Sequence, residues 1–229
     1  MADSKRELTF LLAGPERRLL RAIAARLPGW VTSDGLTALG VLAAAGAGAA
    51  YALSGLSTGW LWVASAMLVV NWFGDSLDGT LARVRQAERP RYGHYLDHLV
   101  DSFATSALGL GIGLSPYVDL TLALGAVVVL LVLHINVHLE SAVFGVFRIA
   151  YGRIGTTELR ILLILANTAL ALHVEAVGSV WRPLIGLANG AVALLLIGMV
   201  IALVARFGRN LNRLARLEPV RLTGSGSGR

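Results

Sequence analysis

The feature that most constrains this chain is a group of four aspartates within sequence that is otherwise apolar enough for a membrane. The chain has 229 residues, of which 55% are hydrophobic and 15% are charged, and its mean hydropathy is +0.68. These values are typical of a membrane protein with several spans. A carboxylate inside a bilayer is costly and needs a cation beside it. The sequence therefore predicts a functional site at Asp75, Asp78, Asp97 and Asp101.

Apolar segments long enough to cross about 30 Å of hydrocarbon predict an all-α fold with six transmembrane helices. The breaks between them carry the Gly, Ser and Pro residues that are usual in turns. The predicted spans are residues 35–54, 59–82, 95–115, 117–139, 157–177 and 183–205.

The chain divides into three predicted regions. In residues 1–30, leucines at helical spacing alternate with arginines, which is typical of an amphipathic helix in the membrane interface. Residues 31–207 form the six-helix transmembrane domain that would hold the site. Residues 208–229 form a basic tail that ends in a flexible Gly/Ser segment.

The distribution of basic residues predicts the orientation. All 20 Lys and Arg residues except Arg182 precede the first span, follow the last one, or lie next to the breaks after the second and fourth spans. By the positive-inside rule, both termini and the aspartates face the cytoplasm. Anionic lipid headgroups account for the net charge of +6, so nucleic-acid binding is not predicted. A short chain rich in Ala, Gly and Arg suggests a bacterial inner membrane.

The spacing of the aspartates indicates a metal site. Asp75 and Asp78 are three residues apart, and Asp97 and Asp101 are four apart on the next helix, so each pair shares one helical face. Facing pairs would offer the oxygen ligands that Mg²⁺ or Mn²⁺ prefers, with room for two ions. Such ions commonly bind phosphate groups of a substrate, and the guanidinium of Arg83 adds positive charge nearby. In the structural alternative, the acids merely pair with the neighbouring arginines.

The pattern Asp75-x2-Asp78-Gly79-x2-Ala82-Arg83-x9-Gly93-x3-Asp97-x3-Asp101 resembles the signature of the CDP-alcohol phosphotransferase family. The resemblance implies six spans behind an interfacial helix, homodimers, and transfer of a phosphoalcohol group from a CDP-alcohol to a hydroxyl compound with release of CMP. It implies metal ligation by Asp75, Asp78, Asp97 and Asp101, with Asp101 a ligand or the general base. It also implies that the CDP moiety is held by Gly79, Ala82 and Arg83.

Two fragments are more similar to the choline and ethanolamine branch of that family. They are the stretch from Asp97 to Ser102, read as Asp-His-x-x-Asp-Ser, and the Gly-Thr-Thr-Glu segment that ends at Glu158. The resemblance implies that His98 and Glu158 activate the diacylglycerol hydroxyl, with CDP-choline or CDP-ethanolamine as the favoured donor. In the alternative, CDP-diacylglycerol reacts with a small polar alcohol. Glu158 would equally serve as a helix cap.

Other classes of protein remain open. A cation channel or transporter would distribute its acids along a route across the bilayer, whereas these cluster on one side. A purely structural membrane protein would tolerate the loss of the carboxylates.

The histidines are weaker signals. His134 and His138 are four residues apart, a spacing that suits a transition metal. No third ligand is obvious unless Glu140 or another helix contributes one, and otherwise these two histidines are expected to line a polar cavity. His94 is predicted to lie at the edge of the aspartate site.

Overall fold

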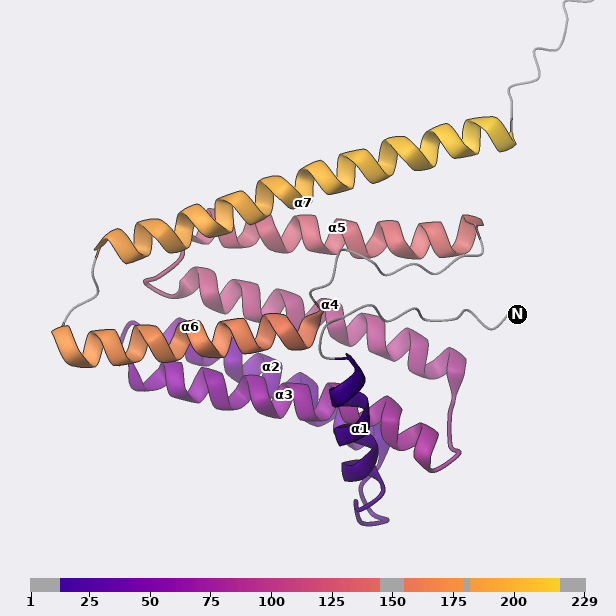
Figure 1. The fold of residues 1–229 in the computed structure, drawn as a ribbon, viewed down its shortest axis with the longest axis horizontal. Coiled ribbons are helices and arrows are strands. Elements are labelled where there is room, and N and C mark those ends of the chain that lie inside the picture. The colour runs from indigo at the N-terminus through magenta and orange to yellow at the C-terminus, as the bar shows by residue number, and fades with distance from the viewer. Residues whose placement is uncertain (1–12, 145–154, 179–181, 219–229) are drawn as a thin grey trace, which may run out of the picture.

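The structure, a computed structural model, describes residues 13–144, 155–178 and 182–218. Within these ranges it contains seven α-helices and no strand, which confirms the all-α class (Figure 1). The helices are α1 (Ala13–Ala24), α2 (Ser33–Leu53), α3 (Gly59–Val84), α4 (Pro90–Leu114), α5 (Leu120–Phe144), α6 (Thr156–Val177) and α7 (Arg182–Leu217).

Local sequence explains several of the boundaries. The Thr32 hydroxyl accepts the Gly35 N–H at 3.0 Å and caps α2, and Pro90 occupies the first turn of α4. Gly178, with a φ of 72°, ends α6. α7 continues well beyond the predicted span end at residue 205, because the segment that follows is rich in the helix formers Leu and Arg. Residues 208–217 of the predicted basic tail are thus helical, and residues 219–229, with the predicted Gly/Ser segment, lie outside the described part.

Four of the described helices are long and apolar enough to cross a membrane: α2, α5, α6 and α7. α3 and α4 have 26 and 25 residues, which at 1.5 Å per residue gives about 39 and 37 Å. Both therefore exceed the hydrocarbon thickness of about 30 Å. Their charged and polar residues lower their apolar character, so six spans stay a prediction.

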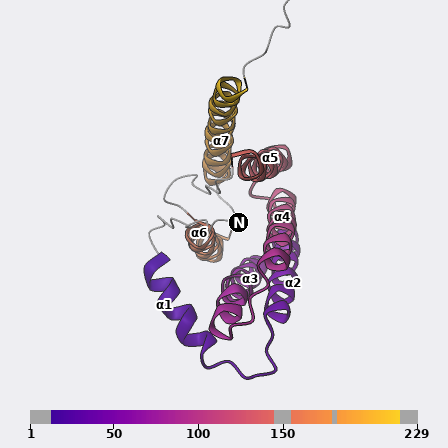
Figure 2. The ribbon, with the colours of Figure 1, turned by 90° about the vertical axis from the view of Figure 1, so that its right-hand side faces the viewer.

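The helices α2 to α7 run roughly along one axis, and α1 lies across it (Figures 1 and 2). α2 packs against both α3 and α4, α5 packs against α4 and α7, and α6 packs against α3. α2, α4 and α6 begin toward the end of the bundle where α3, α5 and α7 finish, at the right of Figure 1. We call this the α1 end.

α1 falls within the predicted N-terminal helical region and contacts α3. Its residues Leu20 and Ala24 are buried in a small core with Leu36, Leu77 and Leu81. Part of its apolar face thus packs on protein, while Leu19 is 51% exposed. Its place in the membrane interface stays a prediction.

Glycines bring α2 into close backbone contact with both of its neighbours. A Cβ atom on Gly74 of α3 would lie 2.5 Å from the Leu36 carbonyl oxygen, and one on Gly48 of α2 would lie 2.4 Å from that of Ala107 on α4. Real Cβ atoms do not come this close to backbone oxygens, so only glycine fits. Small residues allow such contacts between membrane helices, and here they fix the positions of α3 and α4 relative to α2.

We expect Gly48→Ala to lower the free energy of unfolding by about 1–3 kcal/mol, because the new methyl group overpacks the α2–α4 contact. Thermal unfolding in detergent measures the change. Gly190→Ala is the matched control, since a Cβ there meets nothing within 4 Å. Equal stability of the two variants would contradict the role assigned to this contact.

Candidate functional site

A cavity of about 710 Å³ opens at the α1 end of the bundle, within the size range of small-molecule sites. Residues of α1, α2, α3, the start of α4 and the start of α6 line it. His94 lies on its wall, as predicted for the edge of the site. The predicted site residues that line the cavity are Asp75, Asp78, Gly79, Ala82, Arg83, Asp97 and Glu158, together with Gly93 of the motif.

Asp101 and His98 are not among the lining residues, but Asp101 belongs to the same group of charges. It interacts electrostatically with Asp75, Asp78 and Asp97, and with the guanidinium of Arg160. All four aspartates are half-buried. The structure therefore brings the two predicted pairs into one acidic cluster, in which α3 and α4 are both held by α2.

The acidic cluster contains side chains that suit a divalent cation. One ligand atom from each of Asp97, His98 and Asp101 lies within 4.8 Å of the others. Carboxylate oxygens are the ligands that Mg²⁺ and Mn²⁺ prefer. Asp97 and Asp101 on this face of α4 therefore fit the predicted ion.

Asp75 is held by an arginine from α6. The Arg160 Nη2 atom lies 2.7 Å from the Asp75 carboxylate, and the two side chains are only 12% and 19% exposed. Arg160 Nε donates to the Asn71 side-chain oxygen at 2.9 Å, and the Asn71 amide donates to the Gly40 carbonyl at 2.9 Å. Asn71 thus orients Asp75 through Arg160.

From the sequence, Arg160 is only one of the basic residues that predict the cytoplasmic side. The signal that this interpretation missed was an arginine within the predicted span 157–177. An ionisable residue in such a place calls for a named partner, and that partner is Asp75.

Asp78 is held by the first turn of α2. The Thr37 hydroxyl donates to the Asp78 carboxylate at 2.6 Å, and the Ser33 hydroxyl donates to the Asp78 backbone carbonyl at 2.6 Å. Close by, Asp34 forms an ion pair with Arg89 at the start of α4. No motif pointed to Ser33 and Thr37, because residues 41 or more positions apart meet only in the folded chain.

The two motif glycines are not required by packing within the described structure. A Cβ atom on Gly93 would meet nothing within 4 Å, and one on Gly79 would lie 3.7 Å from Arg83 Nη1, an ordinary contact. Both residues line the cavity. Their lack of a side chain leaves space where a ligand can approach the backbone.

Glu158 caps α6, since its carboxylate accepts the Gly155 N–H at 2.9 Å. Next to it, the Thr157 hydroxyl donates to Glu16 of α1 at 2.7 Å. Glu16 also accepts the Trp72 indole N–H of α3 at 2.7 Å. α1 is therefore tied to two helices beside the cavity through Glu16, a residue that sequence reasoning did not single out.

Another helix supplies the neighbour of His138 that the sequence left open. The ring of His138 lies 4.3 Å from that of His98 on α4, between ring centroids. Glu140 instead accepts hydrogen bonds from Arg206 at 2.5 Å and Asn210 at 2.5 Å, and so ties α5 to α7.

The fold and the cavity define an α-helical membrane protein with an acidic, small-molecule-sized site at one end of its bundle. Residues 30–207 match the model of the CDP-alcohol phosphatidyltransferase family, and the chain belongs to that family. The predicted resemblance to this family is therefore confirmed.

The chain is also similar to the phosphatidylinositol phosphate synthase of Cutibacterium acnes (strain DSM 16379 / KPA171202). The two proteins are 33% identical over 84 residues, which is 37% of this chain and 38% of that protein. The similarity thus spans well under half of either protein.

We expect Arg160→Gln to lower the free energy of unfolding by about 3 kcal/mol, because it leaves the half-buried Asp75 carboxylate without its cation. A cycle with Asp75→Asn and the double variant, unfolded in EDTA, measures the coupling. The double variant should be more stable than the sum of the single losses implies. Arg89→Gln, at the exposed pair with Asp34, is the control and should leave stability unchanged within error. Additive losses at Arg160 and Asp75 would exclude the coupling.

Proposed function

We propose that this chain is an integral membrane enzyme of phospholipid synthesis that transfers a phosphoalcohol group from a CDP-alcohol to a hydroxyl acceptor and releases CMP. One observation carries this: three acids of the family motif, together with its glycines and arginine, line one cavity, and the fourth acid interacts with them. The comparison with the family supports the reaction class.

The four aspartates Asp75, Asp78, Asp97 and Asp101 are the proposed ligands of Mg²⁺ or Mn²⁺, in a site for two ions. When bound, such ions neutralise the pyrophosphate charge and polarise the phosphoryl group. Arg160 and Thr37 hold the side chains of Asp75 and Asp78 in place, and such support of the ligands lowers the cost of assembling a metal site.

Gly79, Ala82 and Arg83 are the proposed contacts for the CDP moiety. A guanidinium group pairs well with phosphate oxygens, and Arg83 is oriented by a hydrogen bond to the Thr80 hydroxyl at 3.3 Å. Gly79 has no side chain and Ala82 has a small one, so a nucleotide can approach the backbone of this cavity wall closely.

The transfer also needs a group that takes the proton of the acceptor hydroxyl. In the favoured version His98 takes it and Glu158, on the cavity wall, orients the hydroxyl. In the alternative Asp101 takes it. Asp101 and His98 share a face of α4 with Asp97, so either proton acceptor would act next to the proposed metal ligands.

Two observations favour different CDP-alcohol donors. The Asp-His-x-x-Asp-Ser form around Asp97 and the position of Glu158 on the cavity wall favour CDP-choline or CDP-ethanolamine with diacylglycerol. The similarity to a phosphatidylinositol phosphate synthase favours CDP-diacylglycerol with a small polar alcohol.

We further propose that the α1 end faces the cytoplasm of a bacterium, at the inner membrane, and that both termini lie on that side. The basic residues of the described ranges support this placement. All of these arginines except Arg182 lie on or just after α1, around the α3–α4 turn, near the start of α6 or in the last part of α7, at that end. The exposed apolar side chains of the long helices would meet lipid. The homodimer that the motif resemblance implies stays a prediction.

We expect Asp78→Asn to reduce Mg²⁺- or Mn²⁺-dependent CMP release by about 10²-fold or more, because it removes charge that the proposed ions need. Release of CMP from the purified protein measures the effect, and thermal unfolding checks the fold. Asp119→Asn is the matched control: Asp119 caps α5 through the N–H groups of Thr121 and Leu122, and Asn caps equally well. Full activity of the folded Asp78→Asn variant would rule out this metal site, and cation conduction without CMP release would indicate a channel.

A screen of radiolabelled donors should identify the substrate. CDP-choline, CDP-ethanolamine and CDP-diacylglycerol are each supplied with diacylglycerol or with small polar alcohols, and the labelled lipid product is measured. We expect label from an aminoalcohol donor to enter lipid in the presence of diacylglycerol. If CDP-diacylglycerol with a small polar alcohol is the only combination that gives a product, the alternative is established. If no donor gives a product, the proposed reaction class is contradicted.

A further inference from the structure

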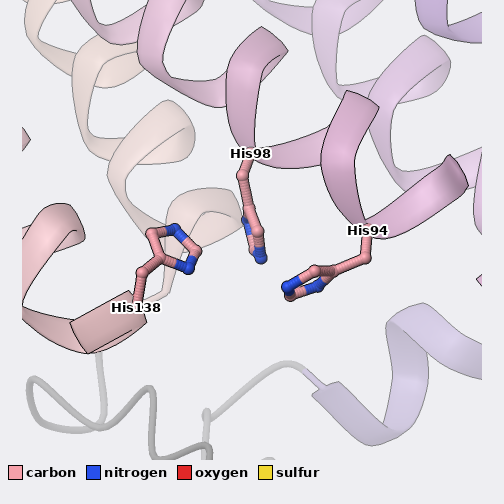
Figure 3. A group of neighbouring side chains, drawn as sticks. All are labelled: His94, His98 and His138. Carbon is pink, nitrogen blue, oxygen red and sulfur yellow. The ribbon is translucent and has the colours of Figure 1, made fainter. Parts of the chain in front are cut away.

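Three histidines from two helices form a cluster in the structure (Figure 3). His94 and His98 are four residues apart on α4, and His138 lies near the end of α5. α4 and α5 pack against each other, so the beginning of α4 and the end of α5 meet at the α1 end. The sequence pointed only to the pair of His134 and His138 on one helix, and the fold adds His98 and His94 as neighbours of His138.

The three imidazoles converge on a shared space. The ring centroids are 4.2 Å apart for His94 and His98, 4.3 Å apart for His98 and His138, and 6.0 Å apart for His94 and His138. One ring nitrogen from each residue lies within 4.8 Å of the others. Figure 3 shows the rings directed from the two helices toward one another.

This geometry is close to that of a tetrahedral metal site. With Zn–N bonds of about 2.0–2.1 Å, imidazole nitrogens around zinc lie about 3.4 Å apart. Side-chain rotations that move the nitrogens by about 1 Å would reach this spacing without a change of backbone. Three histidines with a fourth position open to water is a ligand set that zinc enzymes use.

Ligand chemistry separates this cluster from the aspartates. Imidazole suits Zn²⁺, Cu²⁺ and Ni²⁺, whereas Mg²⁺ and Ca²⁺ take carboxylate, carbonyl and water oxygens. The two groups adjoin, because His98 also lies near Asp97 and Asp101. His94 is exposed and His98 and His138 are half-buried, so an ion can reach the cluster from solvent.

We propose that His94, His98 and His138 form a second metal site, which binds one transition-metal ion such as Zn²⁺ through three imidazoles. This site adjoins the proposed Mg²⁺ or Mn²⁺ site, and while zinc is bound there His98 cannot also take the acceptor proton.

The test measures zinc bound to the full chain, purified in detergent without a polyhistidine tag and stripped with EDTA. The protein is dialysed against Zn²⁺ with excess Mg²⁺, so that Mg²⁺ competes at the carboxylates, and bound zinc is counted by mass spectrometry. Co²⁺ replaces Zn²⁺ in a parallel sample, because tetrahedral Co²⁺ with nitrogen ligands absorbs visible light. We expect one zinc ion per chain and a tetrahedral Co²⁺ spectrum.

The variants His138→Ala and His94→Ala should lose both signals, with a fall in zinc affinity larger than the 10–100-fold that loss of an outer-shell partner costs. His134→Ala is the matched control, since His134 lies one turn earlier on α5 and outside the cluster. It should keep the zinc ion. Thermal unfolding in EDTA checks each fold, and His138→Gln replaces His138→Ala if that variant unfolds.

Three results would overturn the proposal: no zinc bound in excess Mg²⁺, equal binding by wild type and the folded His138 variant, or equal loss in His134→Ala. An octahedral Co²⁺ spectrum with unchanged stoichiometry would place the ion at the aspartates and would overturn it too.

Discussion

Close backbone contact between α2 and its two neighbours is the constraint on which the rest of the structure depends. Gly48 and Gly74 let α4 and α3 approach α2 more closely than any side chain would allow. α3 carries Asp75 and Asp78, and α4 carries Asp97 and Asp101, so these contacts fix the distance between the two acidic pairs. Membrane helices gain little from apolar burial against each other, and such fitting of surfaces then carries much of their association.

The acidic cluster illustrates how a membrane domain tolerates carboxylates. Arg160 compensates Asp75 directly, and the Thr37 hydroxyl donates to Asp78. One arginine does not balance four mutually repelling acids. The remaining negative charge favours a divalent cation, in the same way that carboxylate groups hold hard ions in soluble proteins. The aspartates that carry this charge lie within the residues that match the CDP-alcohol phosphatidyltransferase family model.

Much of the fold and of the site was predictable from the sequence because the signals are local. The length of the apolar segments predicted the helices. The spacing of Asp75, Asp78, Asp97 and Asp101 predicted two acidic helix faces, and in the structure these faces lie next to each other. The boundaries of α4 and α7 were less accurate. α4 begins at Pro90, which suits a first helical turn, and α7 continues because helix formers follow the apolar segment. The partner Thr37 and the meeting of His138 with His94 were not predictable, because they arise from packing between helices far apart in the sequence. Arg160 stood out as an arginine within a predicted span, but the sequence did not identify Asp75 as its partner.

The hydrogen bonds of Glu16 change how the amino-terminal helix is understood. This carboxylate accepts from Trp72 of α3 and from Thr157 of α6, and residues of α1 form part of the cavity wall. A helix of this kind is a component of the binding chamber, not a detachable membrane anchor. A chain without α1 would thus keep the helices that carry the aspartates, yet lose the side of the cavity wall formed by Glu16, Arg17, Leu20 and Arg21.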